Sequence, residues 1–143
     1  MKFWIGVVTR DFVKRAEEGG YIQLSQGKFG PLEKMSPGDW LIYYSPKAKV
    51  EGKELCQKFT AICKVTGEHP YEEEIFPGFA PYRLAAEYLP SKEVDMEPLV
   101  KKLNFIENRK NWGFRFKFGC FKVDESAFDI IKNLMLEKDN KDS

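Results

Sequence analysis

Cationic and aromatic side chains alternate along the segment 101–122, KKLNFIENRKNWGFRFKFGCFK. The segment holds seven lysine or arginine residues and one acidic residue, Glu107, so its formal charge is +6 (7 − 1). The rest of the chain then carries −5, because the total is +1. Cations that neutralise phosphates, together with rings on which bases stack, are what single-stranded nucleic-acid binding requires. We therefore predict contacts to a nucleic-acid backbone from Arg109, Lys110, Arg115 and Lys117.

The alternation within 113–118 limits how much of this segment is available to a ligand. Successive side chains of a strand point to opposite faces, so Phe114 and Phe116 would share one face, and Arg115 and Lys117 the other. We expect these phenylalanines to pack in the core rather than to form a stacking platform. The outward cations either contact phosphate or keep the surface soluble.

Two other places combine a ring with polar neighbours. Trp112 lies in a basic turn before that strand, where it either covers a ligand or packs against the end of the fold. The loop 26–30, QGKFG, offers Lys28 and Phe29 between two glycines that permit close backbone approach. We expect Gln26, Lys28, Phe29 and Trp112 to bind ligand.

Residue patterns typical of catalysis and of metal binding are weak. The chain has one histidine, His69, and three cysteines at unrelated spacings, which cannot form a zinc site of standard spacing. It has neither a glycine-rich phosphate loop nor a nucleophile-elbow motif. The run at 72–74, EEE, is typical of a solvated face and would repel a polyanion. We predict no metal, no cofactor and no catalytic residue.

Composition and charge point to a soluble protein of the cytoplasm. With 143 residues, 43% of them hydrophobic and 31% charged, the chain suits one globular domain over 1–143, with a disordered tail at 137–143. The three cysteines read as reduced thiols. The apolar run 3–8 is too short for a signal sequence or a membrane span, so we expect no membrane partner. A monomer is favoured.

Periodicity and turn signals predict short strands with few helices. We expect strands at 3–8, 21–24, 39–44, 59–66, 83–89 and 113–118. Thr9 would cap a helix over 10–18 that ends at the glycines 19–20, and Asp124 would cap a last helix reaching residue 136. A helical turn at 31–34 and a short helix at 97–103 complete the pattern. Strands with peripheral helices predict an α+β fold, a mixed β-barrel with short flanking helices.

The stretch PGDWLIYYSP, residues 37–46, combines a turn with a ring-rich strand. Proline and glycine suit the second and third positions of a tight turn. In an ideal strand Tyr43 and Tyr44 point to opposite faces, so we expect one ring in the core and the other in a binding site. Ser45, at the end of that strand, is expected on the rim of the site.

Four stretches together resemble the EVE domain of the PUA-like superfamily, in its small stand-alone prokaryotic form. They are KFWIGVV, PGDWLIYYS, FTAICKV and NFIENRKNWGFRFKFG, and the resemblance runs from about residue 2 to about residue 136. It implies a pseudo-barrel with a pocket that holds a flipped or modified base. Thr9, Arg10, Tyr44 and Ser45 would then lie at the mouth, closed by the loop of Lys28 and Phe29 and by Trp112, and Tyr43 is a further expected ligand residue. Many EVE domains carry histidine where this chain has Tyr44, so a proton-shuttle role there is in doubt.

Three functions are compatible with these features. The first is a nucleic-acid-binding module for a modified or flipped base, with RNA favoured over DNA. The second is a hydrolase of modified nucleosides, because the related ASCH domains resemble small amidohydrolases that act on such nucleosides. In that case Lys28 would be the base, Glu33 the proton carrier and Thr9 the hydroxyl. The third is a protein-interaction domain without a nucleotide ligand. We place the first ahead of the others because the cations gather in one segment.

Overall fold

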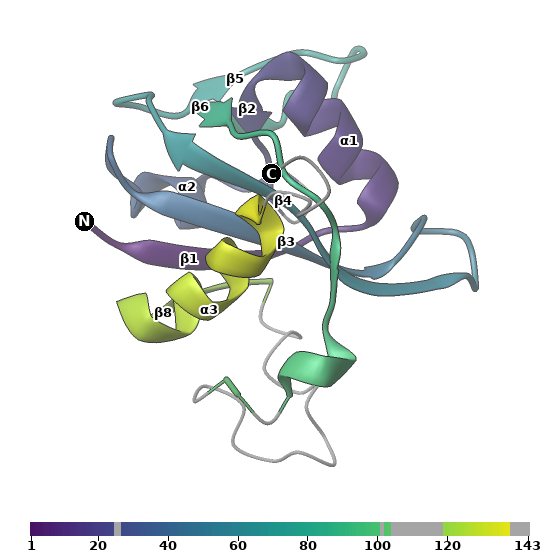
Figure 1. The fold of residues 1–143 in the computed structure, drawn as a ribbon. Coiled ribbons are helices and arrows are strands. Elements are labelled where there is room, and N and C mark those ends of the chain that lie inside the picture. The colour runs from purple at the N-terminus through teal and green to yellow at the C-terminus, as the bar shows by residue number, and fades with distance from the viewer. Residues whose placement is uncertain (25–26, 101, 104–118, 138–143) are drawn as a thin grey trace.

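A mixed, strongly curved sheet organises the protein, seen here in a computed structural model that describes residues 1–24, 27–100, 102–103 and 119–137 (Figure 1). Its strands are β1 Phe3–Val7, β2 Tyr21–Ile22, β3 Trp40–Lys47, β4 Leu55–Val65, β5 Tyr71–Glu72, β6 Tyr82–Tyr88, β7 Val94–Asp95 and β8 Cys120–Val123. The helices are α1 Arg10–Gly19, α2 Phe29–Glu33, α3 Glu125–Leu136 and a 3₁₀ turn at Glu97–Leu99.

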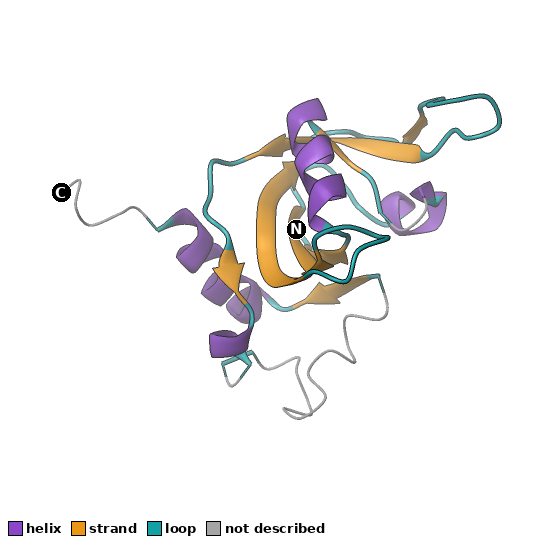
Figure 2. Ribbon diagram, turned by 90° about the vertical axis from the view of Figure 1, so that its right-hand side faces the viewer, coloured by secondary structure: helices purple, strands orange, loops and turns teal. Residues whose placement is uncertain are grey.

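The strands follow the order β2-β6-β4-β3-β1-β8, with β5 paired to β6 and β7 paired to β4. Strands β1 and β3 are parallel, and the other pairs are antiparallel. Figure 2 shows how the sheet curls into a half-barrel with helices on its outside. This is the predicted α+β, PUA-like architecture, which is confirmed.

Strand β3 is buried on both faces, which produces two core layers. Leu41 and Tyr43 face one layer, and Ile42 and Tyr44 face the other, as the period of two requires. The first layer is covered by α1 and α2, and the second by α3. Members of the first layer include Trp4, Val13, Ile22, Leu32, Cys63 and Leu84. Members of the second include Ile5, Phe59, Ile62, Phe128 and Ile131.

The turn before β3 is built around a buried carboxylate. Asp39 N–H donates to the Ser36 carbonyl at 2.9 Å, and Gly38 takes φ +94°, which confirms the predicted proline–glycine turn. The Asp39 carboxylate, 2% exposed, accepts three hydrogen bonds. The donors are Lys2 N at 2.9 Å, Ser36 N at 3.0 Å and Trp4 Nε1 at 3.2 Å. Asp39 thereby joins the chain start to the turn.

Several element boundaries differ from the predictions. Strand β3 continues through Ser45 to Lys47, because the register of its pairing with β4 shifts around Pro46 and accommodates a residue that lacks an N–H. The partner strand β4 begins at Leu55, four residues before the predicted start. Strand β2 is shorter than predicted, and the 97–103 helix is only a 3₁₀ turn.

The ends of the two longer helices follow the sequence signals, with one exception. Gly20 adopts the left-handed conformation that ends α1, and Asp124 accepts from Ala127 N at 2.9 Å at the start of α3. The Thr9 side chain does not cap α1, which corrects the prediction; its hydroxyl donates to Asp11 Oδ1 at 2.7 Å. The predicted strand 113–118 and all but the first residue of the 137–143 tail lie outside the described residues.

Replacing the buried carboxylate should destabilise the whole fold. We expect Asp39→Ala to lower the free energy of unfolding by about 3 kcal/mol, because it leaves buried donors without an acceptor. Urea unfolding followed by tryptophan fluorescence measures this loss. The control, Asp95→Ala on exposed β7, should change it by less than about 0.5 kcal/mol. Equal effects of the two variants would contradict the role given to Asp39.

Candidate functional site

The segment 23–29, which the structure describes at 23–24 and 27–29, is anchored at both of its described ends. At its start, the Tyr43 hydroxyl lies 3.3 Å from both the backbone N and the carbonyl O of Gln23. At its far end, Gly27 takes φ +70° and packs so closely on Pro81 that an added Cβ would lie 2.2 Å from the proline Cβ. This packing fixes the backbone directly before Lys28, the N-cap of α2, and Phe29, its first residue.

Phe29 is one of the predicted ligand residues, and it forms a ring pair with Tyr82. The ring centroids are 5.1 Å apart, tilted by 57°, and Phe29 remains 40% exposed. The Tyr82 hydroxyl donates to Glu72 Oε1 at 2.9 Å, and this bond to a carboxylate raises the pKa of Tyr82. Lys28 is exposed beside this pair. A ring with a neighbouring cation is therefore available on the surface here.

Arg83 follows Tyr82 on β6 and therefore points to the opposite face of the strand, the face of Tyr21 and Tyr71; sequence reasoning missed it. Its Nε donates to Gln23 Oε1 at 3.0 Å, and its guanidinium lies 3.9 Å from the centroid of the Tyr21 ring. An arginine held by one bond and one stacking contact presents a fixed plane with several N–H donors. The signal that could have found it is its place next to the buried Leu84 on a strand of alternating burial, which puts its side chain on the outer face. Phe29 and Tyr82 lie on one face of β6 and Tyr21 and Arg83 on the other. Together with Gln23 and Lys28 we call these residues the loop–β6 site.

Buried tyrosines hold the loop–β6 site from inside. The ring of Tyr43 lies parallel to that of Tyr88, with centroids 6.5 Å apart, and the Tyr88 hydroxyl donates to the Tyr21 carbonyl at 2.8 Å. Burial raises the pKa of both phenols, so both stay protonated and able to donate. Tyr43 therefore supports the site through Gln23, and is itself fully covered.

Tyr44 and Ser45 lie inside the protein, which corrects the expected rim. The Tyr44 ring is 2% exposed and packs edge-on against Phe59, with centroids 5.4 Å apart. Ser45 has no exposed surface, and its Oγ lies 2.9 Å from Thr60 Oγ1. Both tyrosine rings therefore belong to the core, one in each layer, and Ser45 is not on a rim.

Thr9 and Arg10 lie beside a different hollow. A pocket of about 400 Å³ is lined by Arg10, Asp11, Ala48, Lys49, Glu54, Leu55, Cys56, Lys58 and Glu93. Arg10 Nε donates to Glu93 Oε2 at 2.7 Å, and Lys14 Nζ lies 3.2 Å from the same oxygen. Burial raises the pKa of the Cys56 thiol, and the negative charge of the nearby Glu93 carboxylate raises this pKa further. None of the described residues that line this pocket carries a ring, so these residues offer no stacking face of the kind expected of a base site.

The predicted site residues do not all come together. The start of α1, with Thr9 and Arg10, lies near the turn between β3 and β4, whereas Lys28 and Phe29 lie at α2 on the opposite side (Figure 1). The hydrolase arrangement of Lys28, Glu33 and Thr9 is therefore not assembled. The remaining predicted residues lie outside the described part of the chain: Gln26, Arg109, Lys110, Trp112, Arg115 and Lys117.

The described residues also bear on metal binding, membrane spanning and cysteine pairing. Within the described ranges, no three or more His, Cys, Asp or Glu side chains are grouped so that they could hold a metal ion. None of the helices in the described part is long and apolar enough to cross a membrane. The three cysteines, Cys56, Cys63 and Cys120, are free thiols, as predicted.

The curled sheet and its flanking helices define a PUA-like protein, and comparisons with known proteins specify the family. The family model described as "EVE domain" matches residues 2–134, so the chain belongs to the EVE domain family. A UPF0310 protein of Mycolicibacterium vanbaalenii is 40% identical over 136 residues, covering 95% of this chain and 94% of that one. The UPF0310 protein YdcG of Bacillus subtilis is 40% identical over 133 residues, covering 93% and 91%.

Solved structures support the fold independently of sequence. A crystal structure of a Pseudomonas syringae protein superposes with a TM-score of 0.58 at 13% identity, covering 92% of this chain and 98% of that one. An NMR structure of a Rhodopseudomonas palustris protein gives 0.55 at 14% identity, covering 96% and 97%. At these identities the likeness concerns the fold alone.

Removing the Tyr43 hydroxyl should loosen the loop–β6 site. We expect Tyr43→Phe to lower the free energy of unfolding by about 1 kcal/mol, because the buried Gln23 backbone loses its partner. Amide hydrogen exchange should show faster exchange at Gln23. The control Tyr82→Phe loses only an exposed bond to Glu72, so its stability should stay within about 0.5 kcal/mol of the native protein. Unchanged exchange at Gln23 in Tyr43→Phe would refute this anchoring role.

Proposed function

We propose that this protein is a nucleic-acid-binding module that recognises a modified or flipped base, in RNA rather than DNA. The observation that carries the proposal is the match of the EVE domain model to residues 2–134. PUA-like domains of this kind hold an extruded base by its faces and its edge, which requires rings and polar groups at one place. The proposal therefore needs a surface of the chain that supplies both.

The loop–β6 site supplies an exposed ring with a neighbouring lysine, Phe29 and Lys28, and an arginine plane on the other face of β6. Phe29 offers an exposed ring face, and the Arg83 guanidinium offers a plane stacked on Tyr21. Bases of single strands stack on aromatic rings and on arginine planes, and their edges accept hydrogen bonds from arginine and lysine. In the proposed complex Phe29 stacks on the base, Lys28 contacts its edge or the adjacent phosphate, and Arg83, on the other face of β6, contacts a neighbouring part of the strand. Tyr43 acts as a positioning residue.

The basic segment 101–122 supplies the charge that such a complex needs. Its formal charge of +6 stands against −5 on the rest of the chain, so a polyanion is attracted to one part of the protein. In the proposal Arg109, Lys110, Arg115 and Lys117 contact phosphates, and Gln26 and Trp112 close over the base. Thr9 and Arg10 take no part in base contact, because their side chains are engaged with Asp11 and Glu93.

Binding should depend on salt in proportion to the number of phosphate contacts. For four contacts to a single strand, affinity should fall about 50-fold between 50 and 200 mM salt, from a slope of about −0.7 per phosphate. Fluorescence anisotropy with a labelled single-stranded RNA carrying one modified base, from a panel of such bases, measures this dependence. A preference for one modified base over its unmodified form is expected. Affinity that is independent of salt and of modification would refute the proposal.

The charge-reversal variant Arg115→Glu should weaken that binding at least tenfold and make the salt slope shallower by about 0.7. The matched control is Lys53→Glu, which makes the same charge change on an exposed residue between β3 and β4. It should leave the affinity within about twofold of the native value. Equal losses from both variants would show that only net charge matters.

The variant Phe29→Ala tests base stacking at the loop–β6 site. We expect roughly a tenfold loss of affinity, since stacking on one ring contributes about 1–3 kcal/mol per base, with no change in salt slope. Phe76→Ala, which removes another exposed ring remote from α2 along the chain, is the control and should bind as the native protein does. Loss in both variants, or in neither, would remove Phe29 from the base site.

A further inference from the structure

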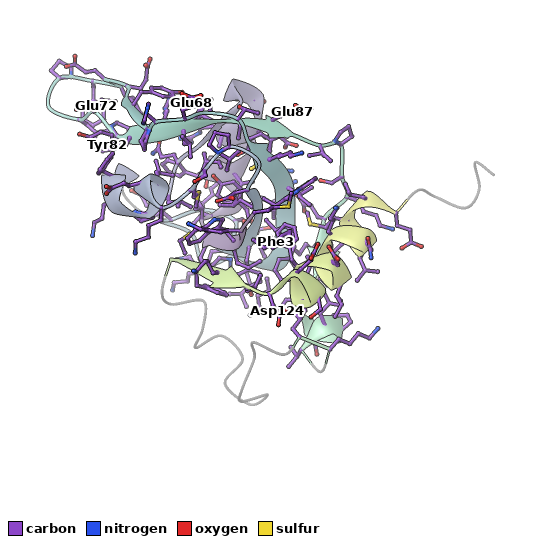
Figure 3. The ribbon with its side chains drawn as sticks, turned by 90° about the vertical axis from the view of Figure 1, so that its left-hand side faces the viewer. Phe3, Glu68, Glu72, Tyr82, Glu87 and Asp124 are labelled. Atoms are coloured by element: carbon purple, nitrogen blue, oxygen red, sulfur yellow. The ribbon has the colours of Figure 1, made fainter. Side chains whose placement is uncertain are left out.

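The β5–β6 hairpin, residues 71–82, extends from the body of the protein as a loop that is ordered along its length (Figures 2 and 3). Its ladder continues past the strands, with Glu73 N donating to the Pro81 carbonyl and Ile75 N to the Phe79 carbonyl, both at 3.0 Å. The tip is a tight turn in which Phe79 N donates to the Phe76 carbonyl at 2.9 Å. Gly78 takes φ +91° in that turn, so the tip has a defined shape.

The tip of this hairpin is apolar and exposed. Ile75 is 49% exposed and Phe76 57% exposed, and the Phe76 ring packs on Phe79 with centroids 5.2 Å apart. Tyr71, at the base of the hairpin, is 43% exposed. Large exposed apolar side chains scattered singly need no explanation, but a cluster on a projecting turn is typical of an interaction site.

The neck of the hairpin carries the opposite kind of surface. Glu72, Glu73 and Glu74 are all exposed, and residues 71–82 contain no basic residue, so the hairpin has a formal charge of −3. Figure 3 shows Glu72 and Glu68 on this side of the molecule, with Tyr82 beneath. Three carboxylates next to an apolar tip repel phosphate and anionic lipid surfaces, and they attract cations.

These observations together restrict what can cover the tip. We propose that the 71–82 hairpin is a docking element for a partner protein whose apolar surface is edged by lysine and arginine side chains. Phe76 and Ile75 would enter the apolar part, and Glu73 and Glu74 would face the cations. Because the turn is already ordered by backbone hydrogen bonds, little conformational entropy is lost on docking. The inference does not depend on the nucleic-acid site, because the docking residues lie within 73–79, whereas Tyr82 at the end of the hairpin belongs to the loop–β6 site.

The test uses two synthetic amphipathic peptides with the same leucine and tryptophan positions, one with lysine and one with glutamate at every polar position. Each is titrated into the full-length ¹⁵N-labelled protein, and amide shifts are followed by NMR. We expect the lysine peptide to shift the amides of residues 71–82 and the glutamate peptide to shift none of them. Absence of binding by the lysine peptide, or shifts confined to another surface, would overturn the proposal.

Variants separate the apolar and the charged contributions. Phe76→Ser and the double charge reversal Glu73→Lys with Glu74→Lys should each weaken binding of the lysine peptide at least tenfold. Val50→Ser, which removes another exposed apolar side chain from the β3–β4 turn, should stay within twofold. Because all of these residues are exposed, thermal unfolding should be unchanged, and the charge reversal stands alone if Phe76→Ser fails to fold.

Two other occupants of the hairpin are distinguished by the same spectra. If a single-stranded RNA shifted the amides of the tip, residues 73–79, the surface would be part of nucleic-acid binding and the proposal would be wrong. If those amides shifted with protein concentration alone, and Phe76→Ser abolished the shift, the occupant would be a second copy of the chain. Either result overturns docking of a separate basic partner.

Discussion

The buried Asp39 carboxylate is the interaction on which the sheet depends. It accepts from the backbone of Lys2 and Ser36 and from the Trp4 indole, so one side chain determines where the chain start meets the turn before β3. The Trp40 N–H then donates to the Lys2 carbonyl, and β1 and β3 continue in parallel register from there. A buried carboxylate is tolerated only when it is fully bonded, so this register is strongly favoured.

Strand β3 also connects the core to surface side chains, through Tyr43. Because β3 is buried on both faces, Tyr43 reaches through the first core layer, and its hydroxyl meets the Gln23 backbone. The side chain of Gln23 then orients Arg83, which stacks on Tyr21. Arg83 and Tyr21 are thus held by a chain of contacts that begins in the core, an arrangement that keeps them in place before a ligand arrives.

The sequence predicted correctly those turns and helix ends that depend only on neighbouring residues. The turn at Pro37 and Gly38, the glycine that ends α1 and the Asp124 cap each depend on a few neighbouring residues, and all are present. The position of Ser45 depends instead on Thr60 of the next strand and on a shift in register, neither of which has a local pattern. Arg83 was missed for the same reason, since its partner Gln23 lies 60 residues away.

The place of β1 in the sheet also determines the order in which the protein can be completed. Strand β1 lies between β3, Trp40–Lys47, and β8, Cys120–Val123, so its two neighbours are far apart in the sequence. At the usual pace of translation, on the order of ten seconds pass between the emergence of these two neighbours. Until β8 is made, one edge of β1 has unpaired backbone groups, the kind of edge on which another strand can pair.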